Sequence, residues 1–225
     1  MLATTLFTAA VAGLFGSAAA IGITPHEQFS SSAGVLGCKI DTNRVAYWPM
    51  AVDCNNICVK VTHRQSGRSL NLLRIDQSGG AYDISYDAWN YLVSGRSTTE
   101  SPQTGGAVDM DIQNVPADNC RSLIRTSNGG LPIAAANGFN FFYSCFSQPA
   151  SWVARHYQLV NIMDQTCHCG WDEVCTFTGT GGANQPTCPH TLGSSGKKMP
   201  DTVFNIQYGT GVRYPAPGLS ACPGA

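Results

Sequence analysis

The fold is decided by the run Cys54-Asn-Asn-Ile-Cys58-Val-Lys-Val-Thr62, which continues as Gly67-Arg-Ser-Leu-Asn-Leu-Leu-Arg-Ile-Asp76 and Tyr82-Asp-Ile-Ser-Tyr-Asp-Ala-Trp89. In the first segment the apolar Val59 and Val61 alternate with polar residues, which is the pattern of a half-buried strand. The glycine that opens the second segment supplies a turn. The rest of that segment, rich in leucine, returns as a second strand, so the run predicts a β-hairpin.

A short helix is expected after the hairpin, between Ser85 and Gly95. Serine is a favoured N-cap residue, and Ile84 and Trp89 have the spacing of a hydrophobic staple across that cap. Asp87 suits the positive end of the helix dipole in the first turn. Gly95 is a natural stop, since glycine accepts the left-handed conformation that ends many helices.

The order of these features resembles a known barrel family. A cysteine-tied strand, a glycine turn, a second strand ending in Asp76 and Asp83-Ile-Ser leading into a helix are similar to the double-psi β-barrel core of expansins, barwin-like proteins and loosenins. The resemblance covers roughly residues 38–95. It implies a mainly β fold with a six-stranded double-psi β-barrel-like core and short helices. It also implies a secreted protein of fungal type that works on cell-wall polysaccharide.

The N-terminal residues 1–20 have the features of a signal peptide. They carry a long apolar stretch and end in Ser17-Ala-Ala-Ala20, the small-residue pattern that a signal peptidase requires. The apolar run is shorter than the about 20 residues of a membrane span, so no membrane partner is expected. Residues 21–225 are expected to form one disulfide-stabilised, extracellular domain that can associate with the cell wall. Its barrel-like core is placed at 38–115 and a cysteine-rich, loop-rich extension at 116–225.

The ten cysteines predict five disulfides, since their number is even and secretion exposes them to an oxidising compartment. They are Cys38, Cys54, Cys58, Cys120, Cys145, Cys167, Cys169, Cys175, Cys188 and Cys222. Cys54 and Cys58 are close in sequence but are expected to face different partners. The first spacing in Cys167-His-Cys-Gly-Trp-Asp-Glu-Val-Cys175 is Cys-x-Cys instead of the Cys-x₂-Cys of zinc sites. We therefore expect a compact disulfide knot there and no metal.

The small number of charged residues restricts the classes of ligand that the chain is expected to bind. Charged residues make up 12% of the chain and the net charge is −1, whereas a nucleic-acid partner would require a basic stripe. The balance gives equally little reason to expect a strongly charged polymer as ligand. The five histidines lie in no nucleophile-elbow context and Gly-x-Ser-x-Gly is absent, so neither a Ser-His-Asp triad nor a cofactor is expected.

The chain beyond Gly95 is expected to be rich in loops and strands. Residues 97–106 are polar and form a surface loop. Alternation predicts a strand at 107–112, and further strands are expected at 139–143, 152–162 and 201–208, of which the 152–162 segment is also compatible with a helix.

Asp83 is the candidate catalytic residue through the resemblance alone, because the aspartate of the matching motif is the catalytic acid in hydrolytic relatives of expansins. Glycoside hydrolysis normally needs a second carboxyl group facing the same bond. Asp41 and Asp53 are the nearest upstream candidates, and neither stands in a recognisable motif. The alternative is structural. Asp83 would cap a helix or turn and Asp76 would stabilise its loop, since aspartate favours both places.

Four residues are candidates for ligand binding: Asp76, Tyr47, Trp48 and Tyr86. The resembled families carry polar cleft residues at the place of Asp76. Flat aromatic faces suit sugar rings because they bury C–H surface and leave the hydroxyls free. Trp48, next to a proline in an expected loop, is the preferred platform. The alternative for these rings is ordinary core packing.

Three classes of function follow from these observations. The first is a secreted, non-catalytic, expansin-like protein that binds or loosens glucan, cellulose or chitin. The second is a secreted effector or defence-type protein that uses the barrel as a scaffold to bind a host or wall protein. The third is a glycan-cleaving enzyme that uses Asp83. The missing second carboxylate favours the first two, and the fold alone cannot separate them.

Overall fold

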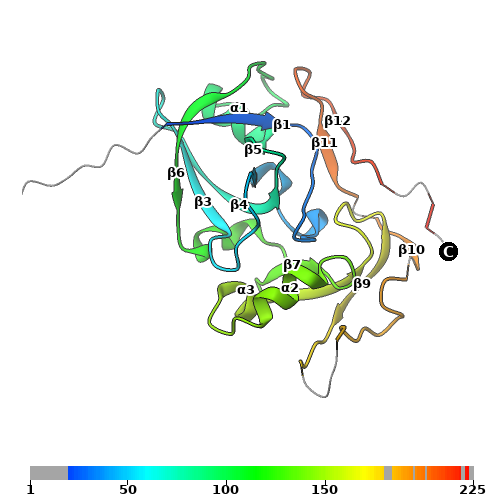
Figure 1. Cartoon of the computed structure of the whole chain (residues 1–225). Coiled ribbons are helices and arrows are strands. Elements are labelled where there is room, and N and C mark those ends of the chain that lie inside the picture. Colours follow the sequence, from blue (N-terminus) through cyan, green and yellow to red (C-terminus); the bar gives the residue numbers. More distant parts are fainter. Residues whose placement is uncertain (1–19, 180–183, 195, 201, 219–220, 223–225) are drawn as a thin grey trace, which may run out of the picture.

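The computed structural model describes residues 20–179, 184–194, 196–200, 202–218 and 221–222, so the expected signal peptide lies outside them apart from its last residue. The first part of the chain forms a closed β-barrel, in the upper part of Figure 1. Its strands are β1 (Ile21–His26), β2 (Val45–Trp48), β3 (Cys58–His63), β4 (Ser69–Gln77), β5 (Tyr82–Ser85) and β6 (Val108–Asn114). The expected fold class, a mainly β protein built on a six-stranded barrel with short helices and disulfides, is confirmed.

The strands close in the order β1-β5-β2-β4-β3-β6, which differs from their order along the chain. β1 runs parallel to β5 and β2 runs parallel to β4, whereas the remaining neighbours are antiparallel. Parallel neighbours need crossover connections, which interleave segments that are distant in sequence. β1 also precedes residue 38, so the barrel begins nearer the N-terminus than the predicted core range of 38–115.

The quoted hairpin forms as predicted, with β3 antiparallel to β4. Helix α1 (Tyr86–Ser94) follows β5 directly and ends at Gly95, whose φ of 81° is the left-handed conformation expected of a helix stop. Ser85 occupies the N-cap position, but its hydroxyl makes no capping hydrogen bond, so that part of the prediction is wrong. Asp87 in the first turn instead accepts hydrogen bonds from the backbone N–H and the hydroxyl of Thr98, both at 2.8 Å.

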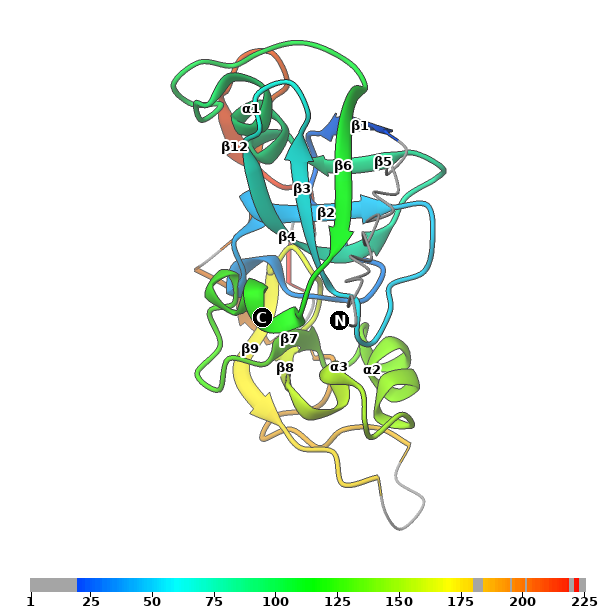
Figure 2. The same ribbon diagram turned by 90° about the vertical axis from the view of Figure 1, so that its left-hand side faces the viewer.

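Most of the second half of the chain packs beneath the barrel in Figures 1 and 2, whereas residues 204–215 run up beside it. The connection between β1 and β2 contains two 3-10 turns, η1 (Gly37–Lys39) and η2 (Thr42–Arg44). The elements of the second half are η3 (Ala117–Leu123), β7 (Leu131–Ala134), α2 (Phe139–Phe146), α3 (Trp152–Arg155), β8 (Tyr157–Ile162), β9 (Cys169–Cys175), β10 (Lys197–Lys198), β11 (Phe204–Ile206) and β12 (Arg213–Pro215). A four-stranded sheet runs in the order β10-β9-β8-β7, and β11 and β12 pair as a separate antiparallel ribbon.

Some strand expectations for this half are wrong. The segment 139–143 starts helix α2, because Phe142 and Cys145 lie on one helical face and insert together into a buried cluster. The edge-on contacts of Phe142 with Phe177 belong to that packing, which overrides the strand preference of aromatic residues. The segment 152–162 is helical at first and becomes strand at Tyr157. Within 202–208, only β11 is strand.

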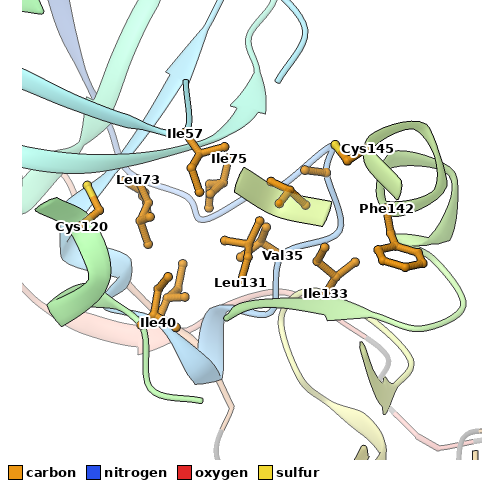
Figure 3. Packing of buried hydrophobic residues seen from close by; sticks show 14 of the residues in the cluster. Val35, Ile40, Ile57, Leu73, Ile75, Cys120, Leu131, Ile133, Phe142 and Cys145 are labelled. Carbon is orange, nitrogen blue, oxygen red and sulfur yellow. The ribbon is translucent and has the colours of Figure 1, made fainter. Parts of the chain in front are cut away.

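Two cores lie back to back across the barrel wall. Leu72 and Leu73 are neighbours on β4 and point to opposite sides of it, because successive side chains of a strand alternate. Leu72 packs inside the barrel with Val59 and Ile84. Leu73 packs on the outside, where Figure 3 shows it facing the second half of the chain. The labelled partners in that outer cluster include Val35, Ile40, Ile57, Ile75, Leu131 and Ile133.

All ten cysteines are paired, which confirms the five expected disulfides. The bridges are Cys38–Cys167, Cys54–Cys145, Cys58–Cys120, Cys169–Cys222 and Cys175–Cys188. Cys54 and Cys58 have different partners, as predicted. No thiolate is left as a zinc ligand, and the described part of the chain holds no group of three His, Cys, Asp or Glu suited to a metal ion. Within that same part, no helix has the length and apolar character needed to cross a bilayer.

Candidate functional site

Three of the predicted site residues form one row across neighbouring barrel strands. In the strand register, Tyr47 on β2 lies opposite Asp83 on β5 and opposite Asp76 on β4. Thr24 on β1 lies opposite Asp83 on its other side. A residue with a hydroxyl therefore stands on each side of Asp83, and Tyr47 separates Asp83 from Asp76. We call these four residues the carboxylate row.

Asp76 is the most constrained member of the carboxylate row. It is 9% exposed, and its carboxylate accepts hydrogen bonds from the backbone N–H of Ser32 at 2.6 Å and of Gln77 at 2.9 Å. The hydroxyl of Ser30 donates a further, short bond to it. These donors belong to the segment after β1 and to the end of β4. Asp76 thus ties that segment to the barrel, which is the structural role that its residue type suggested.

Asp83 is only partly buried and has a different partner. The hydroxyl of Thr24 donates a short hydrogen bond to its Oδ1, and this bond joins β5 to β1. Among the hydrogen bonds of the described residues, none links Asp83 to the N-terminus of α1, so the helix-capping alternative does not account for it. Its carboxylate keeps acceptor positions that Thr24 does not use, and these can bind the hydroxyls of a ligand.

Tyr47 is the residue of the carboxylate row whose pKa is shifted most clearly. Burial, at 2% exposure, raises the pKa of its phenol far above the ordinary value, and the negative charges of Asp76 and Asp83 raise it further. The phenol therefore remains protonated and can donate a hydrogen bond at any physiological pH. Its ring contacts the His26 imidazole, with the ring centroids 4.7 Å apart. The row thus combines two carboxylates with a permanently neutral phenol between them.

The two other predicted ligand-binding rings are core residues. Trp48 is 3% exposed and packs in the barrel interior, where the Arg74 guanidinium carbon lies 5.4 Å from its ring centroid. No sugar can stack on Trp48 while the barrel is closed. Tyr86 is buried as well, and its hydroxyl donates to the carbonyl oxygen of Gln103 at 2.6 Å and accepts from the N–H of Gly209 at 3.1 Å. Trp48 and Tyr86 therefore stabilise the core, and neither ring offers an exposed face on which a sugar could stack.

The upstream carboxylates do not join the row. Asp41 is the N-cap of η2 and accepts from the N–H of Asn43 at 3.1 Å. Asp53 accepts from the N–H groups of Asn55 and Asn56 at 2.6 and 2.7 Å. Partial burial works to raise the pKa of Asp53, but these hydrogen bonds outweigh it and lower the pKa.

A small polar cavity adjoins the row. His26, Tyr47, Ser85, Tyr86 and Asn205 are among the residues that line it. Ser85 is 6% exposed and its hydroxyl has no hydrogen-bond partner among the described residues. About 20 Å³ of the cavity is open to the centre of a water molecule, which is room for one water or one hydroxyl group. The side chain of Ser85 thus lines this cavity instead of capping α1.

Thr24 and His26 are the site residues that the sequence motifs missed. Both lie on β1, which precedes the motif region and reaches β5 only through a parallel pairing. The signal that was available is the alternation in Ile21-Gly-Ile-Thr24, which is typical of a strand directly after the small-residue end of a signal peptide.

No family model matches the chain, and no curated protein matches it. Among solved structures, the chain is similar to the crystal structure of cerato-platanin 3 from M. perniciosa, with 14% sequence identity and a TM-score of 0.34. The match covers 46% of this chain and 99% of that chain.

Proposed function

We propose that the chain is a secreted, non-catalytic protein that binds cell-wall polysaccharide, namely glucan, cellulose or chitin. The ligand contacts the carboxylate row at Asp83 and Thr24, whose oxygens can accept hydrogen bonds from sugar hydroxyls. The five disulfides support an extracellular location, because such bridges persist in oxidising compartments.

The observation that carries the proposal is the position of Tyr47 between the two carboxylates. Glycoside hydrolysis needs two carboxyl groups on one bond, about 5–5.5 Å apart in retaining enzymes and about 6.5–9.5 Å apart in inverting ones. The backbones of Asp83 and Asp76 stand two strand spacings apart, roughly 10 Å across the sheet. Asp76 is moreover held by three donors and separated from Asp83 by a buried phenol. This arrangement favours recognition of hydroxyls over proton transfer to a leaving oxygen.

Sedimentation of residues 21–225 with insoluble glucan, cellulose and chitin tests the binding. Asp83→Asn keeps the shape of the side chain and removes its charge, so binding is expected to weaken about two- to tenfold, the value of one hydrogen bond. Asp111→Asn is the matched control, since Asp111 on β6 makes a surface ion pair with Arg64 and such pairs contribute little. If the protein sediments with none of the three glycans, this proposal is wrong, and the alternative of a scaffold that binds a protein partner is favoured.

The same material tests catalysis. No reducing ends are expected from the three glycans or from peptidoglycan after prolonged incubation with the wild type. Release of sugar that Asp83→Asn abolishes, in a variant with an unchanged melting temperature, would show that the protein is an enzyme.

A further inference from the structure

A groove runs over η1, η2 and the described part of residues 197–215, and it shares Thr42, Asn43, Phe204 and Ile206 with the small cavity that Tyr47 lines. It consists of two adjoining hollows of about 470 and 760 Å³, which share Pro200, Thr202 and Phe204 as lining residues. One hollow extends along η1 and η2 toward the barrel, and the other extends to β10. Sites for small molecules typically measure about 300–1,000 Å³, so each hollow can hold part of an oligosaccharide.

The groove is lined by exposed cations. Arg125 and Arg213 line the first hollow, and Lys197 and Lys198 line the second. None of the four forms an ion pair with a described carboxylate, whereas several cations elsewhere on the chain do. Asp41 also lines the groove, but its carboxylate is engaged in capping η2.

The sequence supports this local excess of positive charge. Between positions 197 and 213 the chain carries Lys197, Lys198 and Arg213 against a single acidic residue, Asp201. The net charge of −1 for the whole chain therefore conceals an uneven distribution. An anionic ligand would find cations here without displacing a described carboxylate from them.

An aromatic ring stands where the two hollows meet. Phe204 on β11 is 42% exposed, which is unusual for a phenylalanine in a chain whose other aromatic rings are mostly packed. The Arg213 guanidinium carbon lies 4.8 Å from its ring centroid. A sugar ring that covered the exposed part of Phe204 would bury C–H surface and place a carboxylate substituent beside Arg213.

We propose that this groove binds an acidic polysaccharide, a chain of uronic acids whose carboxylates pair with Arg213, Lys197 and their neighbours. The inference rests on the proposed function in that the protein is taken to bind wall polysaccharide, and it assigns a second site and a second ligand class. A nucleic acid would carry the same sign of charge, but single strands are usually held by several stacking aromatic residues along a continuous basic path. Phe204 is the single aromatic residue that the two hollows share among their described lining residues.

The test compares two forms of one polymer. Residues 21–225 are titrated with polygalacturonate and with the same polymer after methyl esterification, which keeps the sugar rings and removes their charges. Binding is expected to polygalacturonate, at least tenfold tighter than to the ester, and to weaken as salt screens the charges. Equal binding of both forms, or binding to neither, would overturn the proposal.

Variants locate the site. Lys197→Gln with Arg213→Gln removes one cation from each hollow, and binding of polygalacturonate is expected to fall at least tenfold. Lys60→Gln with Arg96→Gln is the matched control, since both are exposed cations outside the groove, and it should bind like the wild type. Both double variants should keep the wild-type melting temperature because all four side chains are exposed. An equal loss in the control, or tighter binding of single-stranded DNA than of polygalacturonate, would contradict the assignment.

The two proposals fail separately. If the protein sediments with neutral glycans but does not bind polygalacturonate, the barrel site is supported and the groove proposal is wrong. If the protein binds polygalacturonate through Lys197 and Arg213 but binds no neutral glycan, the groove proposal is supported and the barrel site is wrong.

Discussion

The barrel and the second half of the chain are held together in different ways. Each barrel strand is hydrogen-bonded to a neighbour on both sides, and the barrel encloses a core of its own. The second half has an open four-stranded sheet and carries most of the cysteines, and of all ten only Cys58 lies in a barrel strand. Closure removes the need for covalent ties in the first region, whereas the second relies on them because its sheet is small and its loops are long.

The largest expected effect comes from cutting one of the three bridges that join the two regions. Cys54→Ala with Cys145→Ala opens a loop with a sequence separation of 91, and a chain-entropy estimate gives a loss of about 4–5 kcal/mol of unfolding free energy. Cys175→Ala with Cys188→Ala opens a separation of only 13 and should cost about 3 kcal/mol. Denaturant unfolding measures both. A larger loss from the short loop would show that the second half depends on its local bridges more than on its link to the barrel.

A pair of neighbouring leucines compares the two cores directly. Leu72→Ala empties space inside the barrel and Leu73→Ala empties space between the barrel and the second half, and both side chains are fully buried. Each substitution is expected to cost about 2–5 kcal/mol, the usual range for a buried leucine. Equal losses in one cooperative transition would show that the two regions unfold together. A much smaller loss for Leu73→Ala would indicate that the second half separates before the barrel melts.

The smallest expected effect is a difference in pH response. Burial lowers the pKa of His63 in the barrel, and the positive charge of Arg68 lowers it further. A histidine with a lowered folded-state pKa binds protons more readily when unfolded, so stability is lost as pH falls below the unfolded value of about 6.5. His63→Asn, which can keep a contact with Ser66, should flatten the fall in melting temperature between about pH 7.5 and 5.5.

The second half should respond in a more acidic range. Partial burial works to raise the pKa of Glu173, but hydrogen bonds from His190 and Asn161 outweigh it and lower the pKa. A carboxylate with a lowered pKa stabilises the fold above its unfolded value and loses that contribution as pH falls toward the folded one. Glu173→Gln should therefore lower the melting temperature above about pH 5.5, where the wild-type carboxylate stabilises the fold, and should flatten the fall in melting temperature below about pH 4.5. If the dependence of melting temperature on pH is the same in both variants as in the wild type, the predicted difference in pH response between the two regions is wrong.

The features that could be predicted from sequence are those with a local cause. The β3–β4 hairpin follows from alternation and a glycine turn, and the end of α1 follows from Gly95. The pairing of all cysteines follows from their even number and from the expectation of a secreted chain. In each case the residues that decide the structure are close together in the chain or need only be counted.

The features that could not be predicted depend on strand order. The carboxylate row exists because β5 lies between β1 and β2, and no motif records that neighbourhood. Trp48 was expected in a loop because Pro49 follows it, yet it is the last residue of β2 and points into the barrel. In the second half, the aromatic run at 139–143 suited a strand by composition, but it starts helix α2, whose Phe139 and Phe142 pack on Phe177. The cationic groove could not be predicted because its lysines and arginines are separated in sequence, and the net charge of −1 for the whole chain does not show a local excess of positive charge.

The position of β1 in the barrel has a consequence for how the chain is made. β1 leaves the ribosome before the other strands, but its two neighbours are β5 and β6, which are synthesised later. The barrel therefore cannot close until residues near 114 have emerged, and the chain must hold an unpaired apolar strand in the meantime. Pairings that span this much sequence form slowly and leave strand edges open to other chains. We therefore expect the edges of β1 to stay open to pairing with other chains until β6 has been synthesised.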